Sequence, residues 1–480
     1  MSSTLHHVAI LGCGVIGLST AVAILEDQLE NPKARKTVVT IVSKEVPDID
    51  GVTKKHSAEY ASVWAGGHHV SDAKTERELR HDKITFERMS KLARDRPWAK
   101  ATSPTSASTG LQILPIPPTS AGSSARKQAE PLVWVHQTEL FETAGNCAAR
   151  TRLPYEGVLD WYPDVSSSPY PKPPKFHSTD DWHSSLSDFL LSSRQFKPIP
   201  SSSLSQGIGL GCTFSTLDIN VPLYHKWLLN RFLSLSGRLI ISEATSLRSA
   251  IHLASSPSSG ATVICHDTRL WASVGSKIDV LVASPGLGAR FINGINDQAV
   301  HPQRGQVVLV NAPWLSASNI SPPYAHKPKH DLPGYSVVRA QGGREVYIIP
   351  RGDGTVVCGG TRIVGDWDDK PRPETTRKIL ERCLALVPQL ANPQKTSGLV
   401  RAKVEDVEVL SVNVGLRPAR TGGIRLERAK KDVDGVKVIY NYGYGGAGYQ
   451  ASWGAALDAK KLVDEALEPP PAMSGRPAKL

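Results

Sequence analysis

Hydrophobic residues along the chain form the same pattern near both ends. Residues 6–28 hold an apolar run, a glycine-rich turn and a second apolar stretch at helical spacing, and residues 36–46 hold a further run rich in β-branched residues. This order predicts a buried strand, a turn, a helix and a second buried strand. Residues 436–468 repeat the strand, the glycine-rich turn and the helix. The chain is therefore expected to open and close with one kind of supersecondary unit.

Between these ends the pattern predicts further helices and a second sheet. Apolar residues recur at helical spacing among charged ones from 71 to 96, which indicates an amphipathic surface helix. Other helices are expected over 221–237 and 373–390. Strands are expected over 238–242, 277–284, 305–313, 345–351 and 354–361. The last three lie between turn signals, as strands of a largely antiparallel sheet do.

The first glycine-rich turn has the spacing of a dinucleotide-binding motif. Gly12 permits a tight bend, Gly14 lets the backbone approach a pyrophosphate, and Gly17 permits close packing of helix on strand. Glu45, after the second strand, is a candidate ribose ligand, and Lys44 beside it is able to pair with phosphate. A surface pair is the alternative for these two charges. FAD and NAD enzymes share this motif, so it predicts a dinucleotide without choosing between them.

The closing turn offers a second helix N-terminus to an anion. Its glycines are Gly443, Gly445, Gly446 and Gly448. A turn that serves only packing is the alternative. Two such turns in one chain favour a long ligand.

Composition narrows the class of protein. The 480 residues are 40% hydrophobic and 21% charged, without an apolar run near the ~20 residues that span a bilayer or a cleavable signal before the first strand. The net charge of +11 is dispersed and accompanies no nucleic-acid motif. The six cysteines are scattered, without metal-ligand spacing. We therefore expect no membrane, nucleic acid or metal partner, and reduced thiols.

Several segments closely resemble the D-amino-acid oxidase family, and the resemblance covers most of the chain outside its Ser/Pro-rich stretches. The segments are residues 9–19, 59–69, 414–427 and 440–456, supported by 304–310 and 347–351. The sequence departs from the family at Tyr440, where the signature usually has His. It also departs at Ser284 and Pro285, in a segment where the family generally has Asn-Ala-Thr-Gly before Leu-Gly. The second departure is expected to alter one backbone contact to the cofactor.

The resemblance implies an α/β fold, in which a Rossmann-like FAD-binding domain with a parallel-rich sheet is interleaved with a substrate domain on a mixed or antiparallel sheet. The FAD-binding domain is expected to comprise residues 1–70, 206–303 and 405–467, and the substrate domain 71–205 and 304–404. Ser/Pro-rich insertions are expected near 103–126 and 166–205, and an exposed tail over 468–480.

FAD is the cofactor that the resemblance implies. The residues expected to bind it are Gly12, Gly14, Val15, Ile16, Gly17, Lys44, Glu45, Ala61, Ser62, Gly66, Gly286, Gly443, Gly445, Gly446, Ala447, Gly448, Tyr449 and Gln450.

The resemblance also assigns the substrate contacts. Arg417 is expected to clasp the substrate carboxylate, for which a planar guanidinium is well suited. Tyr347 is expected to donate to the same carboxylate, and the backbone carbonyl near Gly446, with Gln450 through water, to meet the amino group. No side-chain base is required, because the neutral amine can expel the alpha hydride directly onto the flavin, so positioning supplies the catalysis. The imine then hydrolyses to a 2-oxo acid and ammonia, and dioxygen is reduced to hydrogen peroxide.

Arg362 and Arg339 indicate which D-amino acid is preferred. Arg362 directly follows Gly-Gly-Thr, as in D-aspartate oxidases, and Arg339 lies one residue away from a second arginine position of that subgroup. They are expected to bind a side-chain carboxylate, as of D-aspartate or D-glutamate. In the alternative, Arg362 pairs with Asp366 or Asp368 and stays outside the pocket.

The last three residues, Ala478, Lys479 and Leu480, match a peroxisomal import signal, which suits a producer of hydrogen peroxide. We therefore expect an import receptor as partner and a peroxisomal location. The sequence is compatible with a homo-oligomer. Other functions remain open: an oxidase of neutral D-amino acids, glycine or sarcosine on the same fold, an NAD-dependent dehydrogenase, or a catalytically silent FAD-binding interaction protein.

Overall fold

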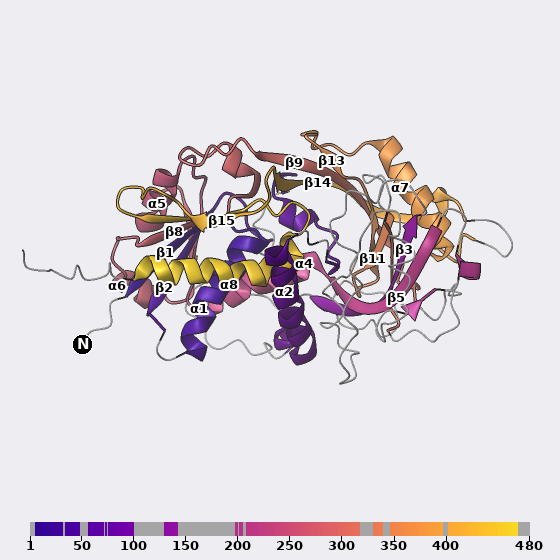
Figure 1. Ribbon diagram of the computed structural model, residues 1–480, viewed down its shortest axis with the longest axis horizontal. Helices are drawn as coiled ribbons and strands as arrows, with labels where there is room; N and C mark the ends of the chain where they lie inside the picture. The colour runs from indigo at the N-terminus through magenta and orange to yellow at the C-terminus, as the bar shows by residue number, and fades with distance from the viewer. Residues whose placement is uncertain are drawn as a thin grey trace, which may run out of the picture.

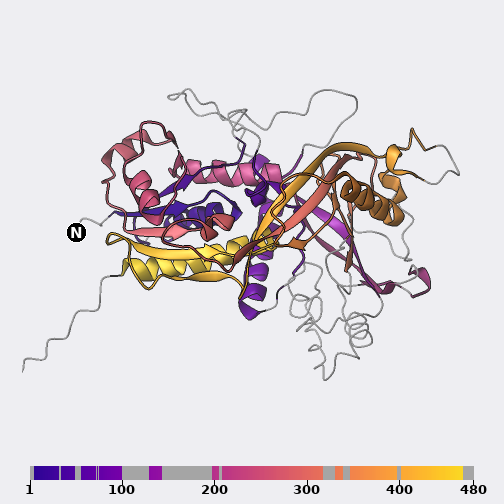
Figure 2. The same ribbon diagram turned by 90° about the horizontal axis from the view of Figure 1, so that it is seen from above.

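The computed structural model describes most of the chain. The described part comprises residues 5–31, 34–48, 56–71, 73, 75–99, 129–142, 197–199, 201–204, 208–316, 330–338, 346–396 and 402–468. Two sheets lie at opposite ends of the long axis of the molecule (Figures 1 and 2). The α/β architecture confirms the predicted fold class.

The first sheet has seven strands in the order β15-β16-β8-β1-β2-β6-β7. Its five inner strands run parallel, and the edge strands β15 and β7 are antiparallel to their neighbours. β1 and β2 are buried along almost their whole length, as expected for a parallel sheet covered on both faces. The bounds are β1 His6–Leu11, β2 Thr37–Ser43, β6 Arg238–Ile241, β7 Thr262–Cys265, β8 Val280–Ala283, β15 Arg425–Arg428 and β16 Lys437–Tyr442.

The second sheet has nine strands, in the order β13-β9-β12-β11-β10-β3-β5-β4, with β14 also paired to β9. Every pairing is antiparallel except that of β10 with β3. The bounds are β3 Leu132–Glu142, β4 Lys197–Pro198, β5 Ile208–Ile219, β9 Val300–Asn311, β10 Pro333–Val338, β11 Val346–Pro350, β12 Thr355–Gly359, β13 Ile363–Val364 and β14 Glu408–Arg420.

Helices cover the first sheet and one side of the second. α1 and α8, the helices of the two glycine-turn units, pack against each other, and α2 packs against α8. A Cβ at Gly454 of α8 would lie within 3.0 Å of the His81 backbone of α2, so this glycine allows the close approach. The helix bounds are α1 Val15–Glu30, α2 Glu76–Asp95, α4 Val221–Ser234, α5 Leu247–Ser255, α6 Thr268–Ser273, α7 Pro373–Leu386 and α8 Gly448–Leu467.

Short 3-10 helices complete the connections. They are η1 Ala61–Trp64, η2 Pro97–Ala99, η4 Ser201–Ser203, η5 Gly286–Arg290, η6 Pro388–Leu390 and η7 Val404–Asp406.

Two long strands change the domain boundaries that we predicted. β5 lies within 206–303 and β14 within 405–467, both assigned to the FAD-binding domain, yet both belong to the nine-stranded sheet. β14 pairs with β9 from the Asn311 end of β9 to the Val300 end, so the two strands lie side by side along their whole length in the second sheet. The partners are too distant in sequence for a local pattern to reveal them. Residues 103–126 and most of 166–205, predicted as insertions, lie outside the described residues.

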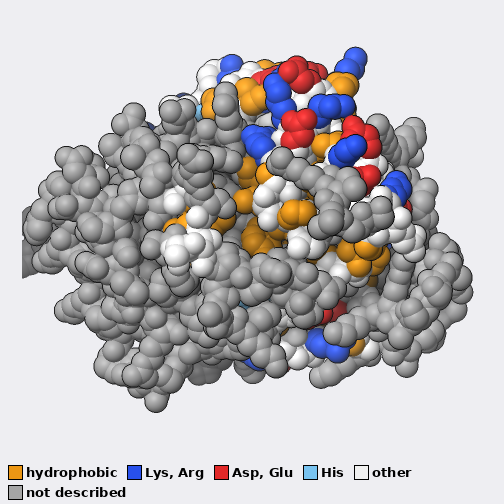
Figure 3. Space-filling view, turned by 90° about the vertical axis from the view of Figure 1, so that its right-hand side faces the viewer, with side chains coloured by type: hydrophobic (Ala, Val, Ile, Leu, Met, Phe, Trp, Pro, Cys, Tyr) orange, Lys and Arg blue, Asp and Glu red, His pale blue; other side chains and the backbone are white. Residues whose placement is uncertain are grey.

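The charged surface alternates in sign. On the face that Figure 3 shows, Lys and Arg side chains lie beside Asp and Glu side chains. In α7, Lys378 forms an ion pair with Glu374. Among the described residues, no helix is long and apolar enough to cross a membrane, and no cluster of three metal-ligating side chains is found. Cys13, Cys212, Cys265, Cys358 and Cys383 have free thiols, and Cys147 is outside the described residues.

Candidate flavin and substrate site

The first glycine-rich turn is too crowded for any larger residue. Gly12 has a φ of 106°, and a Cβ there would lie within 3.0 Å of the Ser284 carbonyl oxygen at the end of β8. A Cβ at Gly17 would lie within 3.0 Å of the Gly12 carbonyl oxygen. The turn thus brings the ends of β1, β8 and α1 together, as a close approach of backbone to a pyrophosphate requires.

Segment 61–66 joins the first turn to the closing turn. The Val15 amide in the first turn of α1 donates to Ser62 Oγ at 3.0 Å. The Tyr60 hydroxyl donates to the Cys13 carbonyl at 2.7 Å, and the Tyr449 hydroxyl donates to the Ser62 carbonyl at 2.9 Å. The segment is therefore fixed to the starts of both α1 and α8.

The closing turn places its helix beside the first. Gly443 and Gly445 have φ values of 92° and 56°, which favour glycine. A Cβ at Gly448 would lie 3.5 Å from Val15 Cγ1, so the two helix N-termini are neighbours. Ala447 is the N-cap of α8, and Tyr449 and Gln450 lie in its first turn.

These features fit FAD. Two adjacent helix N-termini provide backbone amides for a dinucleotide. The buried Ser284 Oγ beside Gly12 has no hydrogen-bond partner within the described residues, so a polar group is left for a ligand there. Gly286, after the Ser-Pro that departs from the family, has a φ of 58° and begins η5.

Glu45 and Lys44 point to different partners. The Glu45 carboxylate accepts hydrogen bonds from the Ser57 amide at 2.8 Å and the Ser57 hydroxyl at 2.6 Å. Lys44 donates to Glu243 at 2.9 Å, with both side chains mostly exposed. That hydrogen bond raises the pKa of Lys44. The structure thus shows the surface pair that was the alternative for Lys44, although with Glu243 rather than Glu45, and the ribose role of Glu45 stays a prediction.

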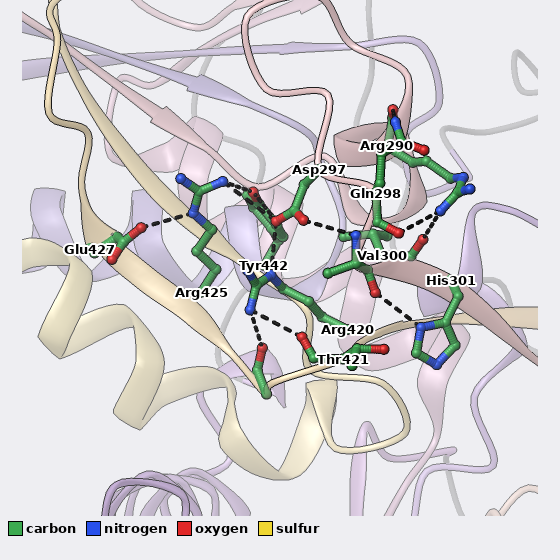
Figure 4. A network of polar contacts seen from close by, with 12 residues as sticks. Arg290, Asp297, Gln298, Val300, His301, Arg420, Thr421, Arg425, Glu427 and Tyr442 are labelled. Atoms are coloured by element: carbon green, nitrogen blue, oxygen red, sulfur yellow. Dashed lines mark hydrogen bonds and ion pairs between the residues drawn. The ribbon is translucent and has the colours of Figure 1, made fainter.

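A buried carboxylate holds together the strands that lead into the closing turn (Figure 4). Asp297 accepts hydrogen bonds from Arg420 Nε at 2.8 Å, from the Tyr442 hydroxyl at 2.9 Å and from Arg425 Nη1 at 3.4 Å. Burial opposes the charge on Asp297, but the bonds from Arg420 and Tyr442 outweigh it and lower the pKa of this carboxyl. Tyr440 stands where the family signature usually has His. Its ring lies under Arg425, whose Cζ is 4.0 Å from the ring centroid.

Tyr347 lies across a space that two glycines leave open. It projects from β11, and a Cβ at Gly359 or Gly360 of the neighbouring strand and turn would lie within 3.0 Å of its ring or hydroxyl. A Cβ at Gly66 would lie 3.6 Å from Tyr347 Cε2. The Tyr347 side chain therefore lies close to Gly359 of the second sheet, to Gly360 after it and to Gly66 of segment 61–66.

Arg417 occupies a similar space beside β9. A Cβ at Gly305 would lie within 3.0 Å of Arg417 Nη1, and Nη1 donates to the Thr361 carbonyl at 3.0 Å. The Thr361 hydroxyl in turn accepts from the Gln306 amide at 2.8 Å. The guanidinium is thus fixed by β9 and by the turn that precedes Arg362.

Arg362 and Arg417 approach the same glycine. A Cβ at Gly446, which is exposed, would lie 3.5 Å from Arg417 Cδ and 3.9 Å from Arg362 Nη1. Among the described residues, Asp366 and Asp368, the alternative partners of Arg362, form ion pairs with Arg372, at 2.8 and 2.9 Å. Arg339 lies outside the described residues.

Two histidines that follow segment 61–66, His68 and His69, are mostly or fully buried. His69 is fully buried, and burial lowers its pKa to about 3. His68 is mostly buried and its Nδ1 lies 2.5 Å from Asp218 Oδ1.

Three glycines that shape the substrate side were not predicted from the sequence. Gly305, Gly359 and Gly360 lie in or beside strands, where glycine often marks close approach of another group. That signal was present in the segments 304–310 and 358–361, but it does not say which side chain fills the space.

Comparisons with known proteins identify the family of the chain. Residues 182–462, more than half of the chain, match the family model DAO, described as FAD dependent oxidoreductase. The chain is similar to a D-aspartate oxidase of Cryptococcus neoformans (29% identity, covering 96% of this chain and 97% of that one). It is also similar to a D-aspartate oxidase of Talaromyces thermophilus (27%; 95% and 95%) and a D-amino-acid oxidase of Schizosaccharomyces pombe (28%; 95% and 96%).

Among solved structures, glycine oxidase of Geobacillus kaustophilus shares the fold, with a TM-score of 0.55, 16% identity and coverage of 96% of this chain and 95% of that one. FAD, rather than NAD, is the cofactor of the matched family. The match and the two glycine turns lead to one conclusion: the chain belongs to the DAO family of FAD-dependent oxidoreductases.

Proposed function

We propose that this protein is an oxidase of D-amino acids that prefers the acidic ones, D-aspartate and D-glutamate. Its products are a 2-oxo acid, ammonia and hydrogen peroxide. The observation that carries the proposal is the convergence of Arg417 and Arg362 on Gly446. The names of the relatives from Cryptococcus and Talaromyces support the same substrate class.

In this proposal the chain binds and orients the substrate. Arg417 clasps the alpha carboxylate with two charge-assisted hydrogen bonds, and the Tyr347 hydroxyl donates to the same group. The carbonyl near Gly446 accepts from the amino group and so fixes the direction of the alpha C–H bond. Bound FAD supplies the hydride acceptor. Because positioning and desolvation of the substrate accelerate hydride transfer, no side chain has to remove a proton from the alpha carbon.

The acidic preference rests on Arg362. Arg362 Nη1 and Arg417 Cδ both lie within 4 Å of the position that a Cβ on Gly446 would take. In the proposal, the side-chain carboxylate of the substrate binds this second guanidinium. A charge-assisted hydrogen bond contributes about 1.5 to 3 kcal/mol, or about 10- to 150-fold in preference.

A substrate panel tests the proposal. Purified protein is expected to be yellow and to form peroxide with D-aspartate and D-glutamate faster than with D-alanine, glycine or sarcosine. Faster turnover of D-alanine would favour an oxidase of neutral D-amino acids. Tight flavin binding with no peroxide from any member of the panel would favour a silent FAD-binding protein.

The location of the protein is part of the proposal. Residues 478–480, outside the described part of the chain, match a peroxisomal address. We expect a fluorescent fusion that keeps this C-terminus free to colocalise with a peroxisomal marker, and a fusion without the three residues to stay in the cytosol. Equal distributions of the two fusions would contradict the proposal.

A further inference from the structure

Arg351 is a buried cation on the face of β11 that also carries Tyr347. It directly follows β11, and strand residues two apart share a face, so Tyr347, Ile349 and Arg351 point the same way. Contacts agree: a Cβ at Gly66 would lie 3.0 Å from Ile349 Cδ1, and Arg351 Nη2 donates to the Ala65 carbonyl at 3.5 Å. Arg351 is only 9% exposed.

The charge of Arg351 is not neutralised within the described residues. Its Nε is buried without a hydrogen-bond partner, and no described carboxylate is within ion-pairing distance. Asp353, the acid that acts on it electrostatically, is already bound by Asn220 Nδ2 at 2.8 Å and by the Thr355 amide and hydroxyl at 2.8 and 2.6 Å. Burial lowers the pKa of Arg351, while Asp353 and Tyr449 oppose that effect.

The position of Arg351 identifies the anion that suits it. Ala65 follows η1 in segment 61–66, so the guanidinium contacts one of the elements that border the cofactor site. It also interacts electrostatically with Tyr449, in the first turn of α8, the other such element. Hydride transfer adds two electrons and one proton to the flavin ring, which therefore gains one negative charge. A buried cation with no carboxylate partner favours such a charge when it forms nearby.

We propose that Arg351 stabilises the negative charge of reduced FAD and thereby raises the reduction potential of the bound cofactor. This role rests on FAD binding and not on the identity of the amino acid. Arg351 directly follows β11 of the second sheet, whereas the other parts of the cofactor site come from the first sheet and segment 61–66. Arg351 acts there as a positioning residue through its charge.

The test compares holoenzymes of Arg351→Met, Arg351→Lys and the control Arg248→Met, whose arginine is exposed and pairs with Asp434. The readouts are the affinity for sulfite, which adds to flavin and leaves an anionic ring, and the potential from equilibration with a redox dye. We expect Arg351→Met to bind sulfite about tenfold more weakly or worse, with a potential lower by about 30 mV per tenfold. Arg351→Lys and Arg248→Met should stay close to wild type. Wild-type values for Arg351→Met would overturn the proposal.

A second variant decides the matter if Arg351→Met does not retain FAD. Asp353→Asn removes the neighbouring negative charge and keeps an oxygen for Thr355, so sulfite affinity and potential should both rise. Unchanged or lower values would contradict the electrostatic role. Because neither readout uses an amino acid, these results are separate from the outcome of the substrate panel.

Discussion

Gly305 offers a direct test of the role of Arg417, because it changes the position of the guanidinium without changing its charge. Gly305 lies within β9, where extended backbone accepts alanine. The Cβ of Gly305→Ala would overlap Arg417 Nη1, Nη2 and Cζ, all within 3.0 Å. These atoms form the end of a flexible side chain, so we expect the arginine to move while the strand remains.

The size of the effect follows from the bonds that are lost. A displaced guanidinium cannot keep both parallel hydrogen bonds to the substrate carboxylate, each of about 1.5 to 3 kcal/mol. Loss of both gives at least about 3 kcal/mol, or at least about 150-fold in kcat/KM.

Peroxide formation with D-aspartate measures this loss, together with FAD content and thermal unfolding. Gly260→Ala is the matched control, because a Cβ at Gly260 would meet no atom within 4 Å. The control should keep wild-type kcat/KM. A Gly305→Ala enzyme with normal FAD content and unchanged kcat/KM would show that Arg417 does not hold the carboxylate.

Three further predictions concern specificity and stability. Arg362→Leu should lower the ratio of kcat/KM for D-aspartate to that for D-alanine by about 10- to 150-fold, and an unchanged ratio would place Arg362 outside the pocket. Burial lowers the pKa of His7 to about 4 and those of His69 and His225 to about 3, so these histidines stay neutral in the fold. The free energy of unfolding should therefore be greatest above pH 6.5 and fall below it, by up to about 1.4 kcal/mol per pH unit and histidine, which denaturant titrations at several pH values would measure. Asp297→Asn should lower the free energy of unfolding at neutral pH. Its difference from wild type should shrink as the pH falls below ~4, because the carboxyl of the unfolded chain then takes up a proton while the lowered pKa keeps the folded one charged; a constant difference would refute the charged role.

The sequence was sufficient for the parts of the site that depend on local geometry. The spacing of Gly12, Gly14 and Gly17 predicts a strand, a turn and a helix, and β1 and α1 confirm it. The closing unit is confirmed in the same way by β16 and α8. Turn and helix are decided by neighbouring residues, so a single chain displays them.

Contacts between distant segments were beyond such patterns. Gly415 pairs with Gly305 in the register of β14 and β9, and only this pairing brings Arg417 into the space beside Gly305. Lys44 meets Glu243, which lies far along the chain. Arg351 is the last residue of the predicted strand 345–351, and its contact with Ala65 joins it to a segment far away in the chain. Such placements follow from tertiary packing, which no local spacing encodes.

The most direct test of the central claim is anaerobic mixing of the purified yellow protein with single amino acids while flavin absorbance is followed. We predict that D-aspartate bleaches the flavin band rapidly, that D-alanine does so more slowly and that L-aspartate does not. Readmission of oxygen should restore the band and release one hydrogen peroxide for each flavin. A flavin that no D-amino acid reduces would contradict the account.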